Sequence, residues 1–418
     1  MRTFGVERLI RRSIIAGKIR APASVAAPHR ILFACSVAVG QTVVSNLPPS
    51  PNIDATISAC NAFGADIVTE GTVADVFGAE EIFPPPILAC GASNTTLKLF
   101  ISLCSLFDKE VELSGSGQLG KKPIEPYVGY LERLGATCFT PSGFLPVRIK
   151  GPISVEQMVY PSQLGTQFLS GLLLCAPLRM DDTEIGIEGQ MPGWEYVGQT
   201  IGVMKKCGIS FSSEGSDFLY VQGGQEYAPP GEIEVPPSSY LSSFLLLAGA
   251  VAGRIEVEGM PPDPALEKLL TSFGAEAHSR NGNFLSSAGS LSSASLSAPE
   301  LGRLLPHALV LASLAAGETS IKNMGSLGRS EGARMRIVMR ELSKMGASFT
   351  DKGGELLVKG GRLAGAEINA EGNAAAAMAL SVAALAAGGQ AKIIGAECVS
   401  DSYHGFFRDL ASLGAIIR

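Results

Sequence analysis

The sequence predicts a two-domain α/β protein built from six copies of one helix-and-strand unit, each about seventy residues long. Six apolar stretches each run into a glycine, which is followed by alanine or isoleucine and then by a strand-like run. These glycines are Gly64, Gly135, Gly208, Gly274, Gly346 and Gly414, at intervals of 71, 73, 66, 72 and 68 residues. A glycine at a fixed place in a repeated unit is typical of a helix C-terminus that needs positive φ.

A second repeated pattern supports the same unit. An apolar helix, a short polar turn and a strand recur at residues 37–44, 106–111, 178–185, 251–255, 315–321 and 386–393. Residues 223–231 hold several glycines and prolines between the third and fourth copies, which indicates a hinge with three copies on each side. We therefore expect one domain over residues 19–231 and a discontinuous second domain over residues 1–18 and 232–418.

Composition indicates a soluble intracellular protein and gives no reason to expect a nucleic-acid partner. Of the 418 residues 46% are apolar, which is enough for large cores, and the formal net charge is −6. The eight cysteines form no Cys-x-x-Cys pair, so we expect buried, reduced thiols and no metal site. The arginine-rich start shows no cleavable leader, and we expect a cytoplasmic location.

Two uncharged apolar segments could be membrane spans or buried helices. Residues 236–253 begin with Pro-Pro-Ser-Ser and end in a turn that the repeat predicts, and residues 374–387 are rich in alanine, so we interpret both as buried helices. Residues 115–120 match the dinucleotide fingerprint, but Pro123 and Pro126 interrupt the helix that should follow. We expect neither membrane nor nucleotide binding.

Eight motifs extend over nearly the whole chain, at residues 17–24, 30–32, 40–47, 90–99, 122–124, 166–169, 176–178 and 330–334. Together they resemble the 5-enolpyruvylshikimate-3-phosphate synthase family. The resemblance implies a two-domain inside-out α/β barrel of six βαβαββ repeats, three per domain. The sister family that transfers enolpyruvate to a nucleotide sugar is less similar, because it needs a cysteine in the loop that corresponds to residues 115–122, where this chain has none.

The resemblance also implies a reaction and its partners. The family is a group of carboxyvinyl transferases of the shikimate pathway, which leads to the aromatic amino acids. They move the enolpyruvyl group of phosphoenolpyruvate to a hydroxyl of a shikimate-phosphate acceptor and expel phosphate through a tetrahedral intermediate. We accordingly expect a monomer that holds a small anionic substrate in a cleft between its domains and uses no cofactor.

In the first half, the resemblance assigns eight residues to substrate binding: Ser24, Arg30, Thr95, Lys98, Lys122, Thr166, Gln167 and Tyr196. Thr166 and Gln167 stand where the family's Ser-Ser-Gln motif holds the acceptor's phosphate. Lys98 keeps the charge of a family arginine beyond a helix start, where amides suit a phosphate. The alternative for Arg30 is a solvated helix face, and a backbone carbonyl instead of a ligand would satisfy the Gln167 amide.

In the second half, the resemblance assigns Glu331 and Arg334 to catalysis, and the alternative is that they pair with each other at i, i+3. Other positions depart from the family. Its catalytic aspartate corresponds to Gly302-Arg303, and its Asp-His-Arg-Met motif becomes residues 373–376, which have neither histidine nor arginine.

Four positions at which the family directs a cation toward phosphoenolpyruvate are Val25, Gln118, Ala375 and Asp401 here, and only Arg334 keeps its charge. A hydrogen bond to a charged group contributes about 1.5 to 3 kcal/mol, so four losses total about 6 to 12 kcal/mol if they are additive. Micromolar binding is worth about 8 kcal/mol. We therefore expect the family's usual donor pose to be untenable unless other cations take over.

Two hypotheses follow. The first is an enolpyruvyl transferase that acts on a shikimate-phosphate-like acceptor with altered substrate contacts. The second is a catalytically inactive paralogue that serves as a ligand-binding or partner subunit. Phosphate release from phosphoenolpyruvate in the presence of an acceptor discriminates between them.

Overall fold

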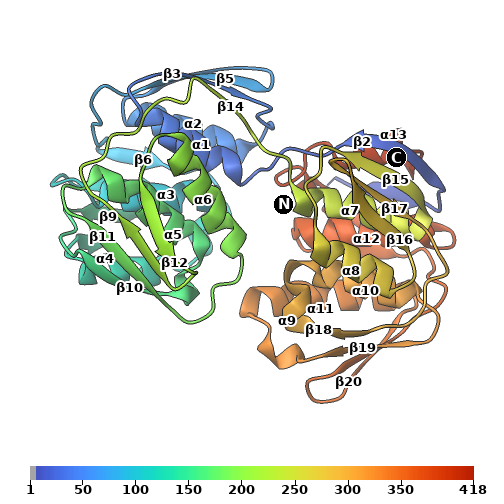
Figure 1. Ribbon diagram of the computed structural model, residues 1–418. Coiled ribbons are helices and arrows are strands. Elements are labelled where there is room, and N and C mark those ends of the chain that lie inside the picture. Colours follow the sequence, from blue (N-terminus) through green and yellow to red (C-terminus); the bar gives the residue numbers. More distant parts are fainter. Residues whose placement is uncertain (1–5) are drawn as a thin grey trace. The chain divides into compact units, whose positions relative to one another are not determined.

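The protein is described by a computed structural model that covers residues 6–418, except the side chains of Arg329 and Ser330, and divides into two compact units (Figure 1). Unit 1 consists of the chain up to Pro22 together with Pro237–Arg418, and unit 2 consists of Ala23–Pro236. In the described residues each unit contains three four-stranded sheets. The predicted α/β fold of six repeats, three per unit, is confirmed.

Each sheet of unit 2 has one parallel strand pair followed by two antiparallel pairs. The first sheet has the order β14 (Glu232–Glu234), β3 (Gly40–Ser45), β5 (Val73–Gly78), β4 (Asp66–Glu70). The second has the order β6 (Ile87–Ala89), β7 (Val111–Ser114), β9 (Val147–Lys150), β8 (Thr137–Phe139). The third has the order β10 (Gln157–Pro161), β11 (Thr183–Glu188), β13 (Phe218–Val221), β12 (Phe211–Glu214).

Unit 2 has one buried helix and one half-exposed helix per repeat. The buried helices are α1 (Ala27–Ser36), α3 (Asn94–Cys104) and α5 (Thr166–Cys175), and the half-exposed ones are α2 (Pro51–Ala62), α4 (Glu125–Arg133) and α6 (Trp194–Lys206). Short 3₁₀ turns are η1 (Leu119–Lys121), η2 (Ser162–Leu164) and η3 (Ala176–Leu178). The buried helices are apolar around most of their circumference because sheets and helices cover them on all sides.

Unit 1 repeats the same sheet pattern. The first sheet has the order β16 (Glu276–Arg280), β17 (Asn283–Ser287), β15 (Gly253–Glu258), β2 (Ile15–Arg20). The second has the order β18 (Ser295–Ser297), β19 (Glu318–Lys322), β21 (Leu356–Lys359), β20 (Ser348–Asp351). The third has the order β22 (Glu367–Asn369), β23 (Gln390–Ile394), β1 (Arg8–Arg11), β24 (Ile416–Ile417).

The helices of unit 1 also fall into two classes. The buried ones are α7 (Ser239–Ala252), α10 (Leu305–Leu314) and α12 (Ala374–Ala386). The others are α8 (Pro264–Ser272), α9 (Ala298–Leu301), α11 (Arg329–Lys344) and α13 (Phe406–Ser412), with 3₁₀ turns η4 (Gly302–Leu304), η5 (Met324–Ser326) and η6 (Ala396–Val399). Both segments that could have been membrane spans are thus buried helices, α7 and α12.

The six repeated glycines follow the ends of α2, α4, α6, α8, α11 and α13, and all have φ between 82° and 107°. The prediction that they terminate helices with positive φ is confirmed. Residues other than glycine rarely adopt a positive φ, which explains why each copy uses glycine there.

The chain passes between the units after Pro22 and after Pro236, a few residues later than the boundaries expected after residues 18 and 231. Strand β2 extends to Arg20 and pairs in parallel with β15, which keeps residues 19–20 in unit 1. Strand β14 pairs in parallel with β3, which keeps residues 232–234 in unit 2. The expected hinge at 223–231 hydrogen-bonds within unit 2, from Gly224 N–H to the carbonyl of Arg179 and from Ala228 N–H to that of Cys207.

No helix in the described part of the chain is both long and apolar enough to cross a membrane. All eight cysteines are free thiols, and six of them are buried, with Cys138 and Cys398 half-buried. Burial raises the pKa of the Cys60 and Cys90 thiols to about 12, so both are protonated near neutral pH.

Candidate functional site

Arg30 is a fully buried cation in the core of unit 2, with 1% of its surface exposed. Its Nε donates to Thr200 Oγ1 at 2.7 Å, one terminal nitrogen donates to the Ala26 carbonyl at 2.7 Å, and the other donates to Ser170 Oγ at 3.1 Å. The guanidinium lies 6.0 Å from the centre of the Tyr196 ring. Burial lowers the pKa of Arg30 to about 10. No carboxylate pairs with Arg30 among the described residues, so its charge is balanced only by dipoles.

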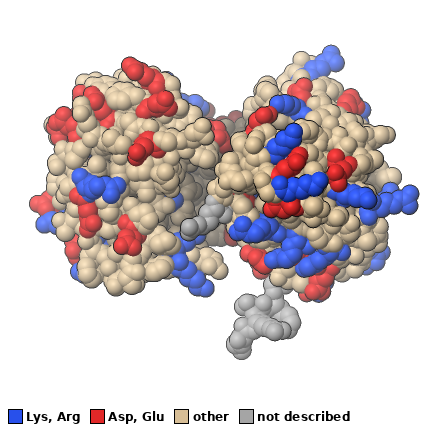
Figure 2. Space-filling model, turned by 90° about the horizontal axis from the view of Figure 1, so that it is seen from below, with Lys and Arg blue, Asp and Glu red and all other residues tan. Residues whose placement is uncertain are grey.

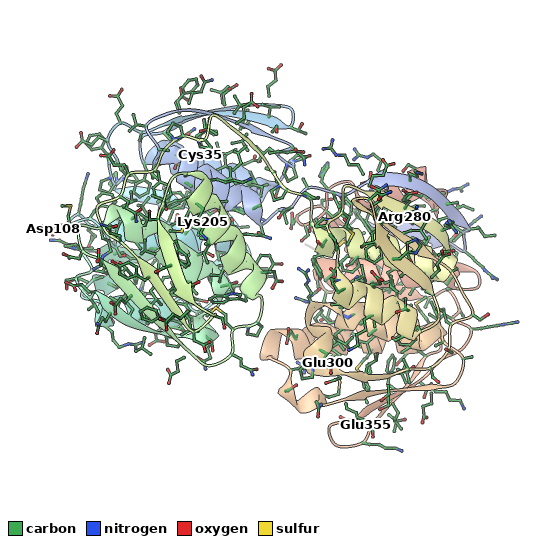
Figure 3. The ribbon with its side chains drawn as sticks, viewed as in Figure 1. Cys35, Asp108, Lys205, Arg280, Glu300 and Glu355 are labelled. Atoms are coloured by element: carbon green, nitrogen blue, oxygen red, sulfur yellow. The ribbon has the colours of Figure 1, made fainter. Side chains whose placement is uncertain are left out.

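The helix arrangement brings the partners of Arg30 together. α1 supplies Arg30, α5 supplies Ser170, and α6 supplies Thr200, and both α5 and α6 pack on α1. In Figure 3, Cys35 marks α1 and Lys205 marks α6, which are neighbouring helices of the same unit. The alternative that Arg30 lies on a solvated helix face is therefore wrong, because α1 is buried on all sides.

Ser24 lies just before α1 and is buried. Its Oγ accepts hydrogen bonds from the backbone N–H groups of Ala26 and Ala27, both at 3.2 Å. These contacts fix the start of the helix that carries Arg30. Ser24 therefore serves the helix terminus in this structure, and its predicted role in substrate binding remains a prediction.

The amide of Gln167 is held by two side chains of α3. Its Nε2 donates to Thr95 Oγ1 at 2.8 Å, and its Oε1 accepts from Asn94 Nδ2 at 2.6 Å. The structure thus joins two of the predicted site residues, Thr95 and Gln167. The partners of this amide are side chains and not the backbone carbonyl that was the alternative.

α3 and α5 approach closely because Gly171 faces α3. A Cβ at this position would lie 2.6 Å from Ser102 Oγ and 2.7 Å from the Lys98 carbonyl oxygen, which is closer than real Cβ atoms come. Glycine therefore permits the close packing that places Thr95 and Lys98 of α3 beside Gln167 of α5.

Lys98 is half-buried, and its Nζ lies 4.7 Å from the centre of the Tyr127 ring. Burial lowers the pKa of Lys98 to about 8. It forms no ion pair with a described residue. A half-buried ammonium over an aromatic ring, near a set of hydroxyls and amides, is suited to bind an anion.

Three predicted residues take other positions. Lys122 is exposed next to η1, Thr166 begins α5 and offers its carbonyl to the Ser170 hydroxyl at 2.7 Å, and Tyr196 is half-buried over Arg30. The backbone carbonyl oxygen of Tyr196 also lies within hydrogen-bond distance, 3.0 Å, of Thr200 Oγ1. Thr166 and Tyr196 therefore belong to the cluster that Arg30 forms with Ser170 and Thr200. No described contact joins Lys122 to this cluster.

In unit 1 the two predicted catalytic residues lie on the first turns of α11. Glu331 Oε2 accepts from the backbone N–H of Gly328 at 3.3 Å and so caps the helix. Arg334 is half-buried, and its Nε is enclosed without a hydrogen-bond partner. Among the described residues no ion pair joins the two, so the alternative that they pair with each other is wrong.

The remaining positions of unit 1 offer little positive charge. Ala375 is buried in α12, which begins with Asn373 as its N-cap, and Asp401 is exposed. Arg303, which with Gly302 is the expected counterpart of the family aspartate, has its guanidinium 5.2 Å from the centre of the Tyr240 ring and 3.9 Å from Asp263.

Sequence reasoning missed two site residues, Ser170 and Thr200. The Ser170 hydroxyl donates to the Thr166 carbonyl, and the single hydroxyl proton of Thr200 has two acceptors in reach, Ser170 Oγ at 2.8 Å and the Tyr196 carbonyl at 3.0 Å. The available signal was a hydroxyl at i+4 from Thr166 and from Tyr196 on otherwise apolar helix faces. The described residues contain no group of three or more histidine, cysteine or acidic side chains that could hold a metal ion.

Comparison with known sequences points to one family. The family model described as EPSP synthase (3-phosphoshikimate 1-carboxyvinyltransferase) matches residues 11–410. The chain is 33% identical over 420 residues to the 3-phosphoshikimate 1-carboxyvinyltransferase of Methanocella arvoryzae, covering 98% of this chain and 99% of the relative. It is 32% identical over 428 residues to that of Halobacterium salinarum, covering 98% and 97%.

Solved structures agree on the fold. EPSP synthase from Acinetobacter baumannii superposes with a TM-score of 0.84 at 20% identity over 99% of both chains. The enolpyruvyl transferase NikO from Streptomyces tendae superposes with a TM-score of 0.76 at 17% identity, again over 99% of both chains. The two-domain fold implied by the sequence resemblance is thus shared by both.

Proposed function

Because the chain belongs to the EPSP synthase family of enolpyruvyl transferases, we propose that it transfers the enolpyruvyl group of phosphoenolpyruvate to a hydroxyl of a shikimate-phosphate-like acceptor. The acceptor is bound by unit 2, and the donor is held with fewer cations than the family uses. The single observation that carries this proposal is Arg30, a buried cation whose neighbours are hydroxyls, a carbonyl and an aromatic ring.

A buried cation without a carboxylate partner costs stability unless a ligand compensates it. The lowered pKa values of Arg30 and Lys98 express this cost, because burial disfavours their charged forms. A phosphorylated acceptor brings the missing negative charge. Gln167, which is half-buried, supplies a neutral polar group that can bind its hydroxyls or phosphate oxygens, whereas the fully buried Ser170 and Thr200 hold Arg30 in position.

Unit 1 supplies fewer groups for the donor. Arg334 has an enclosed Nε without an acceptor, and a carboxylate or phosphate oxygen of the donor would fill that role. Glu331 is the acidic group next to it that can carry the proton which moves during addition to the enol. At present it caps α11, so the proposed reaction requires it to exchange the Gly328 N–H for substrate.

The transfer is expected to be slow and to need a high donor concentration, because Val25, Gln118, Ala375 and Asp401 provide no positive charge. The free, mostly buried thiols support a cytoplasmic location as part of the proposal, and the family resemblance supports a monomer.

The test separates acceptor binding from turnover. Calorimetric titration with shikimate 3-phosphate should give binding that weakens about a hundredfold in Arg30→Met and is retained in Lys205→Met, which removes one exposed lysine from the same unit. Phosphate release from millimolar phosphoenolpyruvate should then depend on shikimate 3-phosphate and on Arg334. If shikimate 3-phosphate binds neither wild type nor the Lys205→Met control, the proposed acceptor is wrong.

A specific observation favours a second candidate, an inactive paralogue that only binds the acceptor. By the family resemblance, the catalytic aspartate corresponds to Gly302-Arg303, and the histidine and arginine correspond to Ala374 and Ala375 at the start of α12. Binding of shikimate 3-phosphate without phosphate release at any donor concentration would establish this candidate and exclude the transferase.

A further inference from the structure

Unit 1 contains a cavity of about 520 Å³ that none of the residues discussed so far as substrate-binding or catalytic lines. Its walls come from α8, from β18 with α9, and from the end of β19 with the residue that follows. Figure 3 labels Glu300 on α9, close to β18 and α8. The volume lies within the range of about 300 to 1,000 Å³ that is usual for small-molecule sites.

The floor of the cavity is apolar, and its rim is charged. Leu269 and Leu301 are buried side chains, Leu296 is half-buried, and all three line the cavity. Lys268, Glu300 and Lys322 are exposed at the rim. A ligand that fits both parts has an apolar body and one charged end.

The charges of the rim favour an anion. Lys268 Nζ and Glu300 Oε2 form an ion pair at 3.0 Å, with 79% and 65% of the side chains exposed, so this pair is weak. Lys322 forms no ion pair with a described residue. The rim therefore has one lysine in excess, and Asn323, whose Nδ2 lies 3.3 Å from Ser297 Oγ, adds an amide beside it.

The surrounding unit strengthens this preference. Unit 1 has 22 Lys and Arg against 17 Asp and Glu, a formal net charge of +5. Figure 2 shows many Lys and Arg side chains gathered on one face of this unit. A positive field raises the local concentration of anions and speeds their association.

We propose that this cavity is a binding site for a small amphipathic monocarboxylate, in which Lys322 binds the carboxylate and the three leucines contact the apolar body. A phosphate dianion is the poorer ligand, because one unpaired lysine leaves half of its charge unbalanced and the apolar floor without a contact. The site is independent of the acceptor site in unit 2, since no residue belongs to both.

The experiment uses three probes on the full chain: benzoate, benzylamine and inorganic phosphate. Benzoate should bind with a millimolar dissociation constant and shift the amide resonances of β18 and α8, and neither benzylamine nor phosphate should do so. Lys322→Met should weaken benzoate binding about tenfold, which corresponds to about 1.4 kcal/mol. Lys352→Met, which removes an exposed lysine of the same unit outside the cavity, should leave benzoate binding unchanged.

A filling variant keeps the proposal falsifiable. Ser272 is exposed at the cavity wall on the last turn of α8, so Ser272→Trp should block benzoate binding without changing the melting temperature by more than a few degrees. The proposal is overturned if benzoate binds equally well to wild type, Lys322→Met and Ser272→Trp, if it does not bind wild type, or if phosphate or benzylamine binds as well as benzoate.

Discussion

Each unit of this protein has a fully buried charged side chain, and the two are treated in opposite ways. In unit 1, Glu341 is completely enclosed and accepts from Lys344 Nζ at 2.6 Å, from Arg340 Nε at 2.7 Å and from the backbone N–H of Asn369 at 3.0 Å. In unit 2, Arg30 is equally enclosed and donates only to neutral oxygens. The protein neutralises one charge with two cations, and it surrounds the other, which we propose binds the acceptor, with neutral oxygens only.

The pKa values follow this difference. Burial opposes ionisation of Glu341, but the hydrogen bonds from Lys344, Asn369 and Arg340 outweigh it, so the pKa of Glu341 lies below its usual value. For Arg30 burial dominates, and its pKa falls to about 10. A buried charge that its surroundings favour indicates a structural role, and one that they disfavour indicates a functional site.

Net charge alone would have suggested that an anion binds in unit 1 and not in unit 2. Unit 2 has 11 Lys and Arg against 22 Asp and Glu, a formal net charge of −11, and unit 1 has +5. Yet the acceptor site proposed for an anion lies in the acidic unit. If the acceptor binds there as proposed, burial and local hydroxyls matter more at this site than the charge of the whole unit, which screening weakens over about 10 Å.

The largest expected effect comes from Arg30→Met. Binding of shikimate 3-phosphate should weaken about a hundredfold, because a hydrogen-bonded charge pair contributes about 1.5 to 3 kcal/mol. The free energy of unfolding should change by less than about 1 kcal/mol, since Ser170 and Thr200 keep each other and their backbone acceptors. Urea unfolding and calorimetry measure both quantities. A large loss of stability with unchanged binding would assign Arg30 a structural role.

Glu341→Gln is the matched change in unit 1 and should destabilise the protein by about 2 to 3 kcal/mol at neutral pH. Because the pKa of Glu341 is lowered by folding, its contribution is present above the unfolded value of about 4.3 and is lost as the pH falls through the folded value. Urea unfolding of both proteins between about pH 7 and about pH 3 should show the difference shrinking in acid. Glu318→Gln, an exposed carboxylate on β19, is the control.

Gly171→Ala tests whether close packing of α3 and α5 assembles the acceptor site. The new Cβ would meet Ser102 and the Lys98 carbonyl, so we expect a loss of about 1 to 2 kcal/mol in unfolding free energy together with weaker acceptor binding. Gly198→Ala on α6 is the control, since its Cβ would meet nothing within 4 Å and should stabilise by about 0.5 to 1 kcal/mol. Equal effects of the two changes would contradict the packing argument.

The smallest effect concerns pH. With a pKa of about 8, Lys98 loses its charge as the pH rises through that value, so binding of shikimate 3-phosphate should weaken about threefold to tenfold between about pH 7 and about pH 9.5. An arginine stays charged over this range, and Lys98→Arg should therefore abolish the dependence. A dependence that persists in the arginine variant would have another origin.

The repeat architecture was accessible from sequence because it depends on local chemistry. Gly64 and its five counterparts mark helix ends where positive φ is needed, and this requirement acts within a few residues. The unit boundaries were less accessible, since Glu232–Glu234 belongs to unit 2 only through pairing with β3, nearly two hundred residues earlier.

The site was predictable in its members but not in its contacts. Arg30, Thr95 and Gln167 could be named from motifs, whereas Ser170 and Thr200, the partners of Arg30, are hydroxyls whose role depends on three helices meeting. Glu331 was named from its motif as a catalytic residue or as the ion-pair partner of Arg334. In the structure its carboxylate accepts from the Gly328 N–H at the start of α11, a contact that a ligand motif does not predict.

Strand β1 has a consequence for the order in which the protein is made. Arg11 of this strand hydrogen-bonds to Gln390 of β23, 379 residues later. At about 5 to 20 residues per second, a ribosome needs about 20 to 75 seconds to supply that partner. Unit 2 can fold in this interval, while β1 lacks its partner strand until β23 has been synthesised. A bulky fusion at the N-terminus should therefore slow the final step of folding, after acceptor-binding competence has already been acquired.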